Sequence, residues 1–307
     1  MLNFEALVMN DRDRVRPFLN QPNMLGTQNC FETTYIWEQT YQDQICIEGN
    51  WLYFYSPLSQ VFSCPVAKDG SMDYREPISK MAEFARANHV PVVIWGVQAE
   101  QQAELERYFP GMFRFESDRD DYDYVYSVEK LTTLSGKHLH GKRNHINKFI
   151  DLYPDWTFEP ISDQNIDDAF SMHVAWCREH DAETNEDLME EYKAVRRCFQ
   201  NFHELGMYGG LIRAGGRAVA YSMAAKVGTE CADVLFEKAY SDIPGAYTIM
   251  NREMAIYLSQ SIPGLRWINR EEDKGEEGLR KAKLSYVPDI LLEKATAYLG
   301  PEKEALL

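Results

Sequence analysis

Residues 130–150 contain no aspartate or glutamate, although acids outnumber bases in the chain as a whole. Within this basic island, Lys142, Arg143, Asn144 and Asn147 lie close together on an expected helix. Their ammonium, guanidinium and amide groups are hydrogen-bond donors that suit a phosphate or a carboxylate. The segment therefore indicates a binding site for a small-molecule or phosphate-bearing substrate. A solvated helix whose charges serve only solubility is an equally good interpretation.

A second group of charged residues follows an expected short strand near the C-terminus. Asn269, Glu271 and Asp273 would lie at the end of this strand and in the loop after it. Arg280 and Lys283 are three residues apart and would share one face of a short helix. Such a set can hold an ammonium group on the carboxylates and a carboxylate or phosphate on the basic pair. By itself the pattern favours a simpler interpretation, an acidic loop followed by a charged helix.

Glu237, Tyr247 and Asn251 are the candidate catalytic residues. Direct attack of an amine or hydroxyl on an ester or thioester needs a proton acceptor and donors that face the developing oxyanion. Glu237, near the end of a predicted strand, could accept the proton, although an ion pair with Lys238 or Arg252 is an alternative role. Tyr247 could donate a hydrogen bond or act as a general acid, or it could serve packing. Asn251 lies one helical turn further, so both side chains can face one site.

His173, Cys177 and His180 have a spacing that places them on one face of a predicted helix. Three such side chains could approach a metal ion. A helix face packed in the core explains the same spacing more simply. We therefore expect no metal site.

Length and charge set broad limits on the protein. The chain has 307 residues, with 32 basic and 48 acidic side chains, and a net charge of −16. This balance excludes a generally basic nucleic-acid-binding protein, and the length predicts two domains. The start has no basic region followed by an apolar run, and no stretch approaches the ~20 apolar residues that span a bilayer. The six cysteines show no paired spacing, so we expect reduced thiols and a cytoplasmic protein.

The second half of the sequence shows a legible order of elements. A strand and two helices precede three antiparallel strands, and a long helix, a strand, a helix and a final strand follow. The expected ranges are 156–161, two helices ending near 180 and 203, 207–214, 217–227, 232–239, 245–260, 265–268, 276–283 and 290–299. This order resembles the fold of GNAT-type N-acetyltransferases, and the first half shows a looser version of it.

We therefore expect an α+β protein with two tandem GNAT-type N-acetyltransferase-like domains. Each would have a mixed, mostly antiparallel sheet flanked by helices. The expected boundaries are 1–130 for the N-terminal domain, 131–155 for a basic linker helix and 156–307 for the C-terminal domain.

The C-terminal charged segment resembles the signature of the phosphatidylglycerol lysyltransferase C-terminal domain family. The matching residues are Asn269, Glu271, Asp273, Gly275, Gly278, Leu279, Arg280, Lys281, Lys283, Tyr286 and Pro288, with Glu237-Lys238-Ala239, Gly245-Ala246-Tyr247, Asn251 and the segment 142–149 upstream. The resemblance covers nearly the whole chain. It implies a tandem acetyltransferase-like fold related to the aminoacyl-tRNA-dependent transferases that modify peptidoglycan.

The membrane relatives in this family move an aminoacyl group from aminoacyl-tRNA to a lipid headgroup. They carry a long transmembrane region, and this sequence shows no membrane-spanning segment. Its net charge also opposes tRNA, which leaves the basic island as the expected landing site for tRNA. The resemblance therefore implies the fold more directly than it implies lipid modification.

The resulting hypothesis is an acyl- or aminoacyltransferase that uses aminoacyl-tRNA or acyl-CoA as donor and has no firmly implied cofactor. The loop 241–246 has a single glycine, a proline and an anionic Asp242, which makes it a poor cradle for the pyrophosphate of acetyl-CoA. Two alternatives are a non-catalytic module that binds a small ligand and an acyl-CoA-dependent N-acetyltransferase. The oligomeric state is left open.

Overall fold

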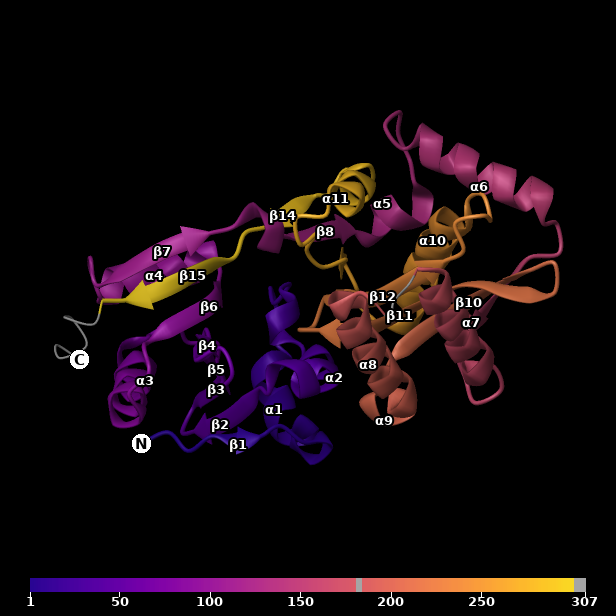
Figure 1. The fold of residues 1–307 in the computed structure, drawn as a ribbon. Helices are drawn as coiled ribbons and strands as arrows, with labels where there is room; N and C mark the ends of the chain where they lie inside the picture. The colour runs from indigo at the N-terminus through magenta and orange to yellow at the C-terminus, as the bar shows by residue number, and fades with distance from the viewer. Residues whose placement is uncertain (181–183, 301–307) are drawn as a thin grey trace.

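Two mixed β-sheets, each flanked by helices, organise the chain (Figure 1). The computed structural model describes residues 1–180 and 184–300. Each sheet combines antiparallel pairs with one parallel pair. The predicted α+β class with two mixed sheets is confirmed.

The N-terminal lobe contains the first sheet. Its strands are β1 (Glu5–Ala6), β2 (Gln44–Glu48), β3 (Trp51–Ser56), β4 (Val61–Ser63), β5 (Val66–Ala67), β6 (Val93–Val97), β7 (Phe113–Ser117) and β15 (Ala295–Leu299). Their order is β1-β2-β3-β4-β6-β15-β7, and β5 pairs with β3. The helices are η1 (Met9–Asp11), α1 (Arg12–Leu19), η2 (Thr27–Asn29), α2 (Phe31–Tyr41), α3 (Arg75–Asn88), α4 (Ala99–Tyr108) and η3 (Arg119–Asp121).

Strand β3 shows how the N-terminal sheet joins the two lobes. All six of its residues are buried, and alternate side chains point to opposite faces. Tyr53 and Tyr55 enter a core with α3 and α4. Leu52 and Phe54 enter a larger core that also holds α1, α2 and most of the C-terminal lobe. The lobes therefore share one hydrophobic core on this face.

The C-terminal lobe is built on the second sheet. Its strands are β8 (Asp123–Ser127), β9 (Thr157–Pro160), β10 (Tyr208–Ala214), β11 (Arg217–Val227), β12 (Cys231–Ala239), β13 (Trp267–Asn269) and β14 (Ile290–Leu292), in the order β14-β8-β13-β12-β11-β10-β9. The helices are α5 (Val128–Thr133), α6 (His140–Leu152), α7 (Ile166–Glu179), α8 (Glu186–Gln200), α9 (Phe202–Leu205), α10 (Ala246–Ser261) and α11 (Glu277–Leu284). The three predicted antiparallel strands are confirmed as β10, β11 and β12.

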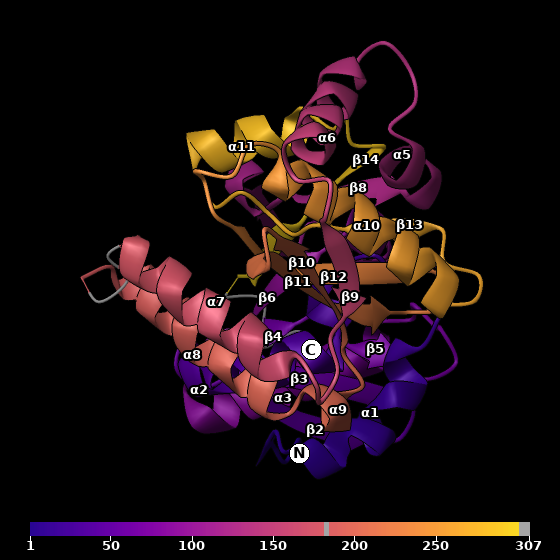
Figure 2. The same cartoon turned by 90° about the vertical axis from the view of Figure 1, so that its right-hand side faces the viewer.

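Helices cover both faces of β10–β12 (Figure 2). On one face, Tyr221 contacts His173 of α7 and Met223 contacts Cys198 of α8. On the other face, a side chain added at Gly210 would meet Met250 of α10. Helix α10 therefore lies against the sheet face opposite α7 and α8.

Each half of the sequence contributes one strand to the sheet that is formed mainly by the other half. Strand β8 pairs with β13 and β14 in the C-terminal sheet, and β15 lies between β6 and β7 in the N-terminal sheet. Figure 1 shows β15, in yellow, among the magenta strands. The expected single strand 290–299 is thus two strands in two sheets. The buried Lys294 lies at this crossover, where its Nζ donates to Asp123 at 2.7 Å.

This exchange departs from a division of the chain into contiguous domains at 1–130 and 156–307. Hydrogen-bond register and a buried ion pair decide which sheet a strand joins, and neither is visible in the local sequence pattern. The described residues include no helix long and apolar enough to cross a membrane. All six cysteines are buried and free.

Candidate functional site

Glu237 lies in a buried polar cluster between β12 and α10. Its neighbour across the sheet is Ser222, and only 8% of its side chain is exposed. Arg270 donates from Nη2 to Glu237 Oε1 at 2.9 Å. The Asn251 amide oxygen, in the orientation that satisfies both ends of the amide, accepts from Arg270 Nε at 3.2 Å. Burial raises the pKa of Glu237, and the positive charge of Arg270 opposes that rise.

Arg270 was not among the residues singled out from the sequence. The sequence offered Lys238 or Arg252 as partners of Glu237. In the structure Lys238 pairs with Glu191 at 2.9 Å. Arg252 pairs with its neighbour Glu253. The partner of Glu237 is instead Arg270, which directly follows β13. Strand β13 pairs with β12 in the sheet, although it lies about thirty residues later in the chain.

Lys142 joins this cluster from α6. Its Nζ lies 3.8 Å from the centre of the Tyr286 ring, and Arg270 lies 5.1 Å from the same ring. Burial, and next the positive charge of Arg270, lower the pKa of Lys142 to about 8. An amine with this pKa exchanges a proton close to neutral pH. Tyr247, one turn before Asn251 on α10, is 41% exposed at the surface.

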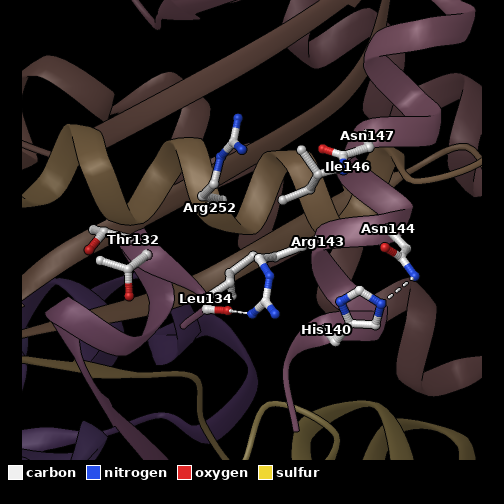
Figure 3. Close-up of a pocket in the computed structure, with 9 residues that line it drawn as sticks. Thr132, Leu134, His140, Arg143, Asn144, Ile146, Asn147 and Arg252 are labelled. Atoms are coloured by element: carbon white, nitrogen blue, oxygen red, sulfur yellow. Dashed lines mark hydrogen bonds between the residues drawn. The ribbon is translucent and has the colours of Figure 1, made fainter. Parts of the chain in front are cut away.

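A pocket of about 240 Å³ opens between α5, α6 and α10 (Figure 3). Arg143, Asn144 and Asn147 of the basic island line it, together with His140 and Arg252. No acidic residue is among its lining residues in the described chain. The structure thus brings three of the four candidate residues of the basic island to one pocket. The fourth, Lys142, instead joins Glu237, Asn251 and Arg270, which we call the Glu237 cluster.

Arg143 has no carboxylate partner among the residues that the structure describes. Its Nη1 donates to the carbonyl oxygens of Leu134 and Gly136. These neutral acceptors orient the guanidinium but do not neutralise it. On the same side of the pocket, Asn144 Nδ2 lies 3.3 Å from His140 Nε2. The pocket is therefore a preformed cluster of donors that can receive an anion.

Asp273 and Arg280, which were predicted to bind opposite ends of a substrate, bind each other in the structure. Arg280 donates to both oxygens of Asp273 at 2.6 and 2.9 Å and to Asp120 at 2.5 Å. The Tyr124 hydroxyl donates to Asp273 at 2.5 Å. These bonds hold the pKa of the fully buried Asp273 well below its usual range. Asp273 and Arg280 therefore fasten the loop before α11.

Asn269 and Lys283 are also engaged in internal bonds. Asn269 Nδ2 donates to Asp123 at 2.9 Å and to the Leu25 carbonyl at 2.7 Å. Lys283 Nζ donates to the carbonyl oxygens of Glu271 and Glu272, and burial lowers its pKa to about 8. These two buried residues hold the loop in place through internal hydrogen bonds.

Glu271 approaches a second acid that the sequence did not single out, Asp233. Asp233 is fully buried; its Oδ2 accepts from Thr33 at 3.2 Å, and its Oδ1 has no hydrogen-bond partner among the described residues. Burial, and then neighbouring acids, raise the pKa of both carboxyl groups well above the usual value. An unpaired acid oxygen of this kind can accept a hydrogen bond from an ammonium group. Asp233 was missed because it lies in the middle of a strand rather than in a charged motif.

Two of the three possible metal ligands, His173 and Cys177, approach each other, with His173 Nε2 3.4 Å from Cys177 Sγ, whereas His180 Nδ1 lies 2.8 Å from the Trp176 carbonyl oxygen. His173 is fully buried and its Nδ1 lies 2.9 Å from the Tyr221 hydroxyl. His180 stacks on Trp176, with ring centres 3.8 Å apart. Within the described ranges, no group of three potential ligands could hold a metal ion.

The loop before α10 is covered by α6. Gly245 has a φ of +88°, and a Cβ there would lie 2.4 Å from the His145 carbonyl oxygen. The backbone of α6 therefore packs directly against the position where an acetyltransferase would approach pyrophosphate. This contact gives a structural reason for the poor phosphate-loop sequence.

Comparison with known proteins agrees with this architecture. The family described as phosphatidylglycerol lysyltransferase, C-terminal, matches residues 23–298. A crystal structure of a conserved protein of unknown function from Bacteroides thetaiotaomicron is 32% identical, covers 98% of this chain and 100% of that one, and has a TM-score of 0.92. The structure of L-PGS from Bacillus licheniformis is 15% identical, covers 98% and 96%, and has a TM-score of 0.65.

Among curated proteins, an uncharacterized protein of Mycoplasmoides gallisepticum is 23% identical over 176 residues. The match covers 56% of this chain and about half, 54%, of that relative's own length. The family match and the fold together support a transferase-like function. The chain belongs to the phosphatidylglycerol lysyltransferase C-terminal domain family.

Proposed function

We propose that this protein is an acyl- or aminoacyltransferase whose donor places a phosphate or another anionic group in the pocket at Arg143. One observation carries the proposal. Lys142 and Arg143 are consecutive on α6, and Asn251 and Arg252 are consecutive on α10. In both pairs the first residue joins the Glu237 cluster and the second lines the pocket. The pocket and the Glu237 cluster therefore use neighbouring faces of the same two helices.

In this proposal an acceptor amine or hydroxyl attacks the acyl carbon directly. Glu237 takes the proton of the attacking group, and burial raises its pKa toward the range that suits a general base. Arg270 and Asn251 orient its carboxylate, and Lys142 supplies positive charge for the developing oxyanion. The bond from the acyl carbon to the leaving oxygen or sulfur breaks, and the leaving group departs with the proton that Glu237 held.

The surroundings favour an aminoacyl donor over acyl-CoA. Helix α6 occupies the space beside Gly245 that pyrophosphate would need. The name of the matching family refers to lysyl transfer. The basic island remains the segment where aminoacyl-tRNA would contact this acidic protein.

The second candidate is a ligand-binding module without catalysis. The observation in its favour is the ion pair of Glu237 with Arg270, which occupies one oxygen of the proposed base. The pocket at Arg143 would then bind the same anion, but no group would be transferred.

The test offers labelled aminoacyl-tRNA or acetyl-CoA to the full chain with a pooled amine and lipid extract. Transfer from aminoacyl-tRNA, reduced by Glu237→Gln and Arg143→Ala but not by Lys148→Ala, is the expected result. Lys148→Ala is the matched control because it removes an equal charge from α6 outside the pocket. Label transfer from acetyl-CoA alone would contradict the aminoacyl donor. Unchanged activity in Glu237→Gln would remove Glu237 from its role.

A further inference from the structure

A second pocket, of about 330 Å³, lies where the two lobes meet. Arg12 and Arg16 of α1 line one side, and Lys226 of β11 lines the other. We propose that this pocket binds a small phosphorylated ligand through its phosphoryl group. It shares no lining residue with the pocket at Arg143 and is not needed for the transfer reaction.

The charge around this pocket is locally positive. Glu32 is its one acidic lining residue, and Arg12 Nε pairs with Glu32 at 3.1 Å. Arg16 and Lys226 are exposed and form no ion pair with any described residue. Two unneutralised cations therefore face one cavity in a chain whose net charge is −16. Such a site attracts an anion in a field that is otherwise repulsive.

Asn29 adds a neutral hydrogen-bond donor to this pocket. It lines the pocket and is only 9% exposed, yet its side-chain amide makes no hydrogen bond with any described residue. An amide beside two free cations can donate to a phosphoryl oxygen, and this would complete its hydrogen bonding.

The walls of the pocket are already held in position. Arg12 donates to the carbonyl oxygens of Glu204 and Leu205 at 2.8 and 2.5 Å, so α1 is tied to the C-terminal end of α9. Gly206, with a φ of +66°, has no room for a side chain because a Cβ would lie 2.8 Å from Arg12 Nη2. A preformed site of this kind binds a ligand without first ordering its loops.

The size and the remaining lining residues limit the ligand. Leu19, Phe31 and Tyr208 form an apolar and aromatic wall beside the charged residues. Pockets for small ligands start at roughly 300 Å³, so the volume fits one compact molecule. A phosphate on a small ring-bearing body, such as a nucleoside monophosphate, matches both walls.

The experiment measures binding to the full chain by calorimetry with inorganic phosphate, adenosine 5′-monophosphate and adenosine. We expect the two phosphate-bearing probes to bind and adenosine not to bind. The double variant Arg16→Ala/Lys226→Ala should weaken binding at least about tenfold, because two charge-assisted contacts are lost. The double variant Arg14→Ala/Arg217→Ala removes the same charge from α1 and β11 outside the pocket, and should stay within about threefold.

Asn29→Ala tests the site without changing its charge. It should weaken phosphate binding several-fold and leave the unfolding curve unchanged, because the amide bonds to no residue in the described part of the chain. Binding that vanishes in Arg143→Ala but survives in Arg16→Ala/Lys226→Ala would place the ligand in the other pocket and overturn the proposal. Equal losses in the two double variants, or no binding of either phosphate probe, would also overturn it.

Discussion

Arg280 and Arg143 are both arginines that the sequence proposed for substrate binding, but the fold treats them differently. Arg280 lies between two carboxylates, at 2.6 Å from Asp273 and 2.5 Å from Asp120. Arg143 is held by two carbonyl oxygens and lines a pocket. The first charge is neutralised inside the protein, and the second remains available. The acceptor that holds an arginine therefore indicates whether it fastens the fold or can receive a ligand.

The largest expected effect is the loss of the Asp273–Arg280 clamp. Asp273→Asn should lower the free energy of unfolding by about 3 kcal/mol or more, because it leaves buried donors without their charged acceptor. Urea denaturation measures this change. Asp120→Asn is the matched control, and because Asp120 is 45% exposed its effect should stay below about 1 kcal/mol. Equal losses of unfolding free energy in the two variants would contradict the conclusion that the buried Asp273 makes Arg280 a structural residue.

The clamp should also depend on pH. Arg280 holds the pKa of Asp273 below its usual value in the folded state. The folded state therefore binds fewer protons, and the stabilisation is complete above the ordinary carboxyl pKa of about 4. It should be lost progressively as the pH falls below that value. The difference in stability between the unmodified chain and Asp273→Asn should shrink over the same range, and a constant difference would contradict the ion pair.

The next largest effect is expected for Arg143, the arginine that lines the pocket. Arg143→Ala should weaken donor binding about 10- to 100-fold, because one hydrogen bond to a charged ligand is worth about 1.5–3 kcal/mol. Its free energy of unfolding should fall by only about 1 kcal/mol. Titration of the donor and urea denaturation measure the two quantities. A large loss of stability with unchanged binding would make Arg143 a structural residue like Arg280.

A smaller effect is expected for Lys142. Its folded pKa is about 8, lower than the ordinary value of 10.5. Between these two values the unfolded chain binds more protons, so stability should rise with pH over this window. Lys142→Met should lack this rise, and unfolding measured from pH 7 to 10.5 compares the two proteins. Parallel pH curves would show that Lys142 keeps an ordinary pKa.

The smallest effect belongs to Lys148, an exposed residue of the same helix. Lys148→Ala should change the free energy of unfolding by less than about 0.5 kcal/mol. Donor binding should fall by no more than about threefold, through the change in overall charge alone. A loss as large as that of Arg143→Ala would mean that the whole basic island, rather than the pocket, attracts the donor.

Local pattern predicted most of the C-terminal lobe. Alternating and apolar runs placed β10, β11 and β12, and helical periodicity placed α10 and α11 within one or two residues. The pattern did not divide 290–299 into two strands, because both parts are equally apolar and differ only in their partners. Lys294, which marks the crossover, resembles an ordinary surface lysine until Asp123 is placed beside it.

The sequence by itself determined the class of fold, the family resemblance and the basic island as a source of anion-binding groups. These depend on residue type, short spacing and charge, which are local properties of the chain. Only the tertiary structure decided that Arg270 pairs with Glu237, that Arg280 is neutralised and that Arg143 is not. It also placed Arg16 and Lys226 at one cavity. The physical reason is that the state of a charge depends on the acceptors and the burial around it, and distant segments supply both.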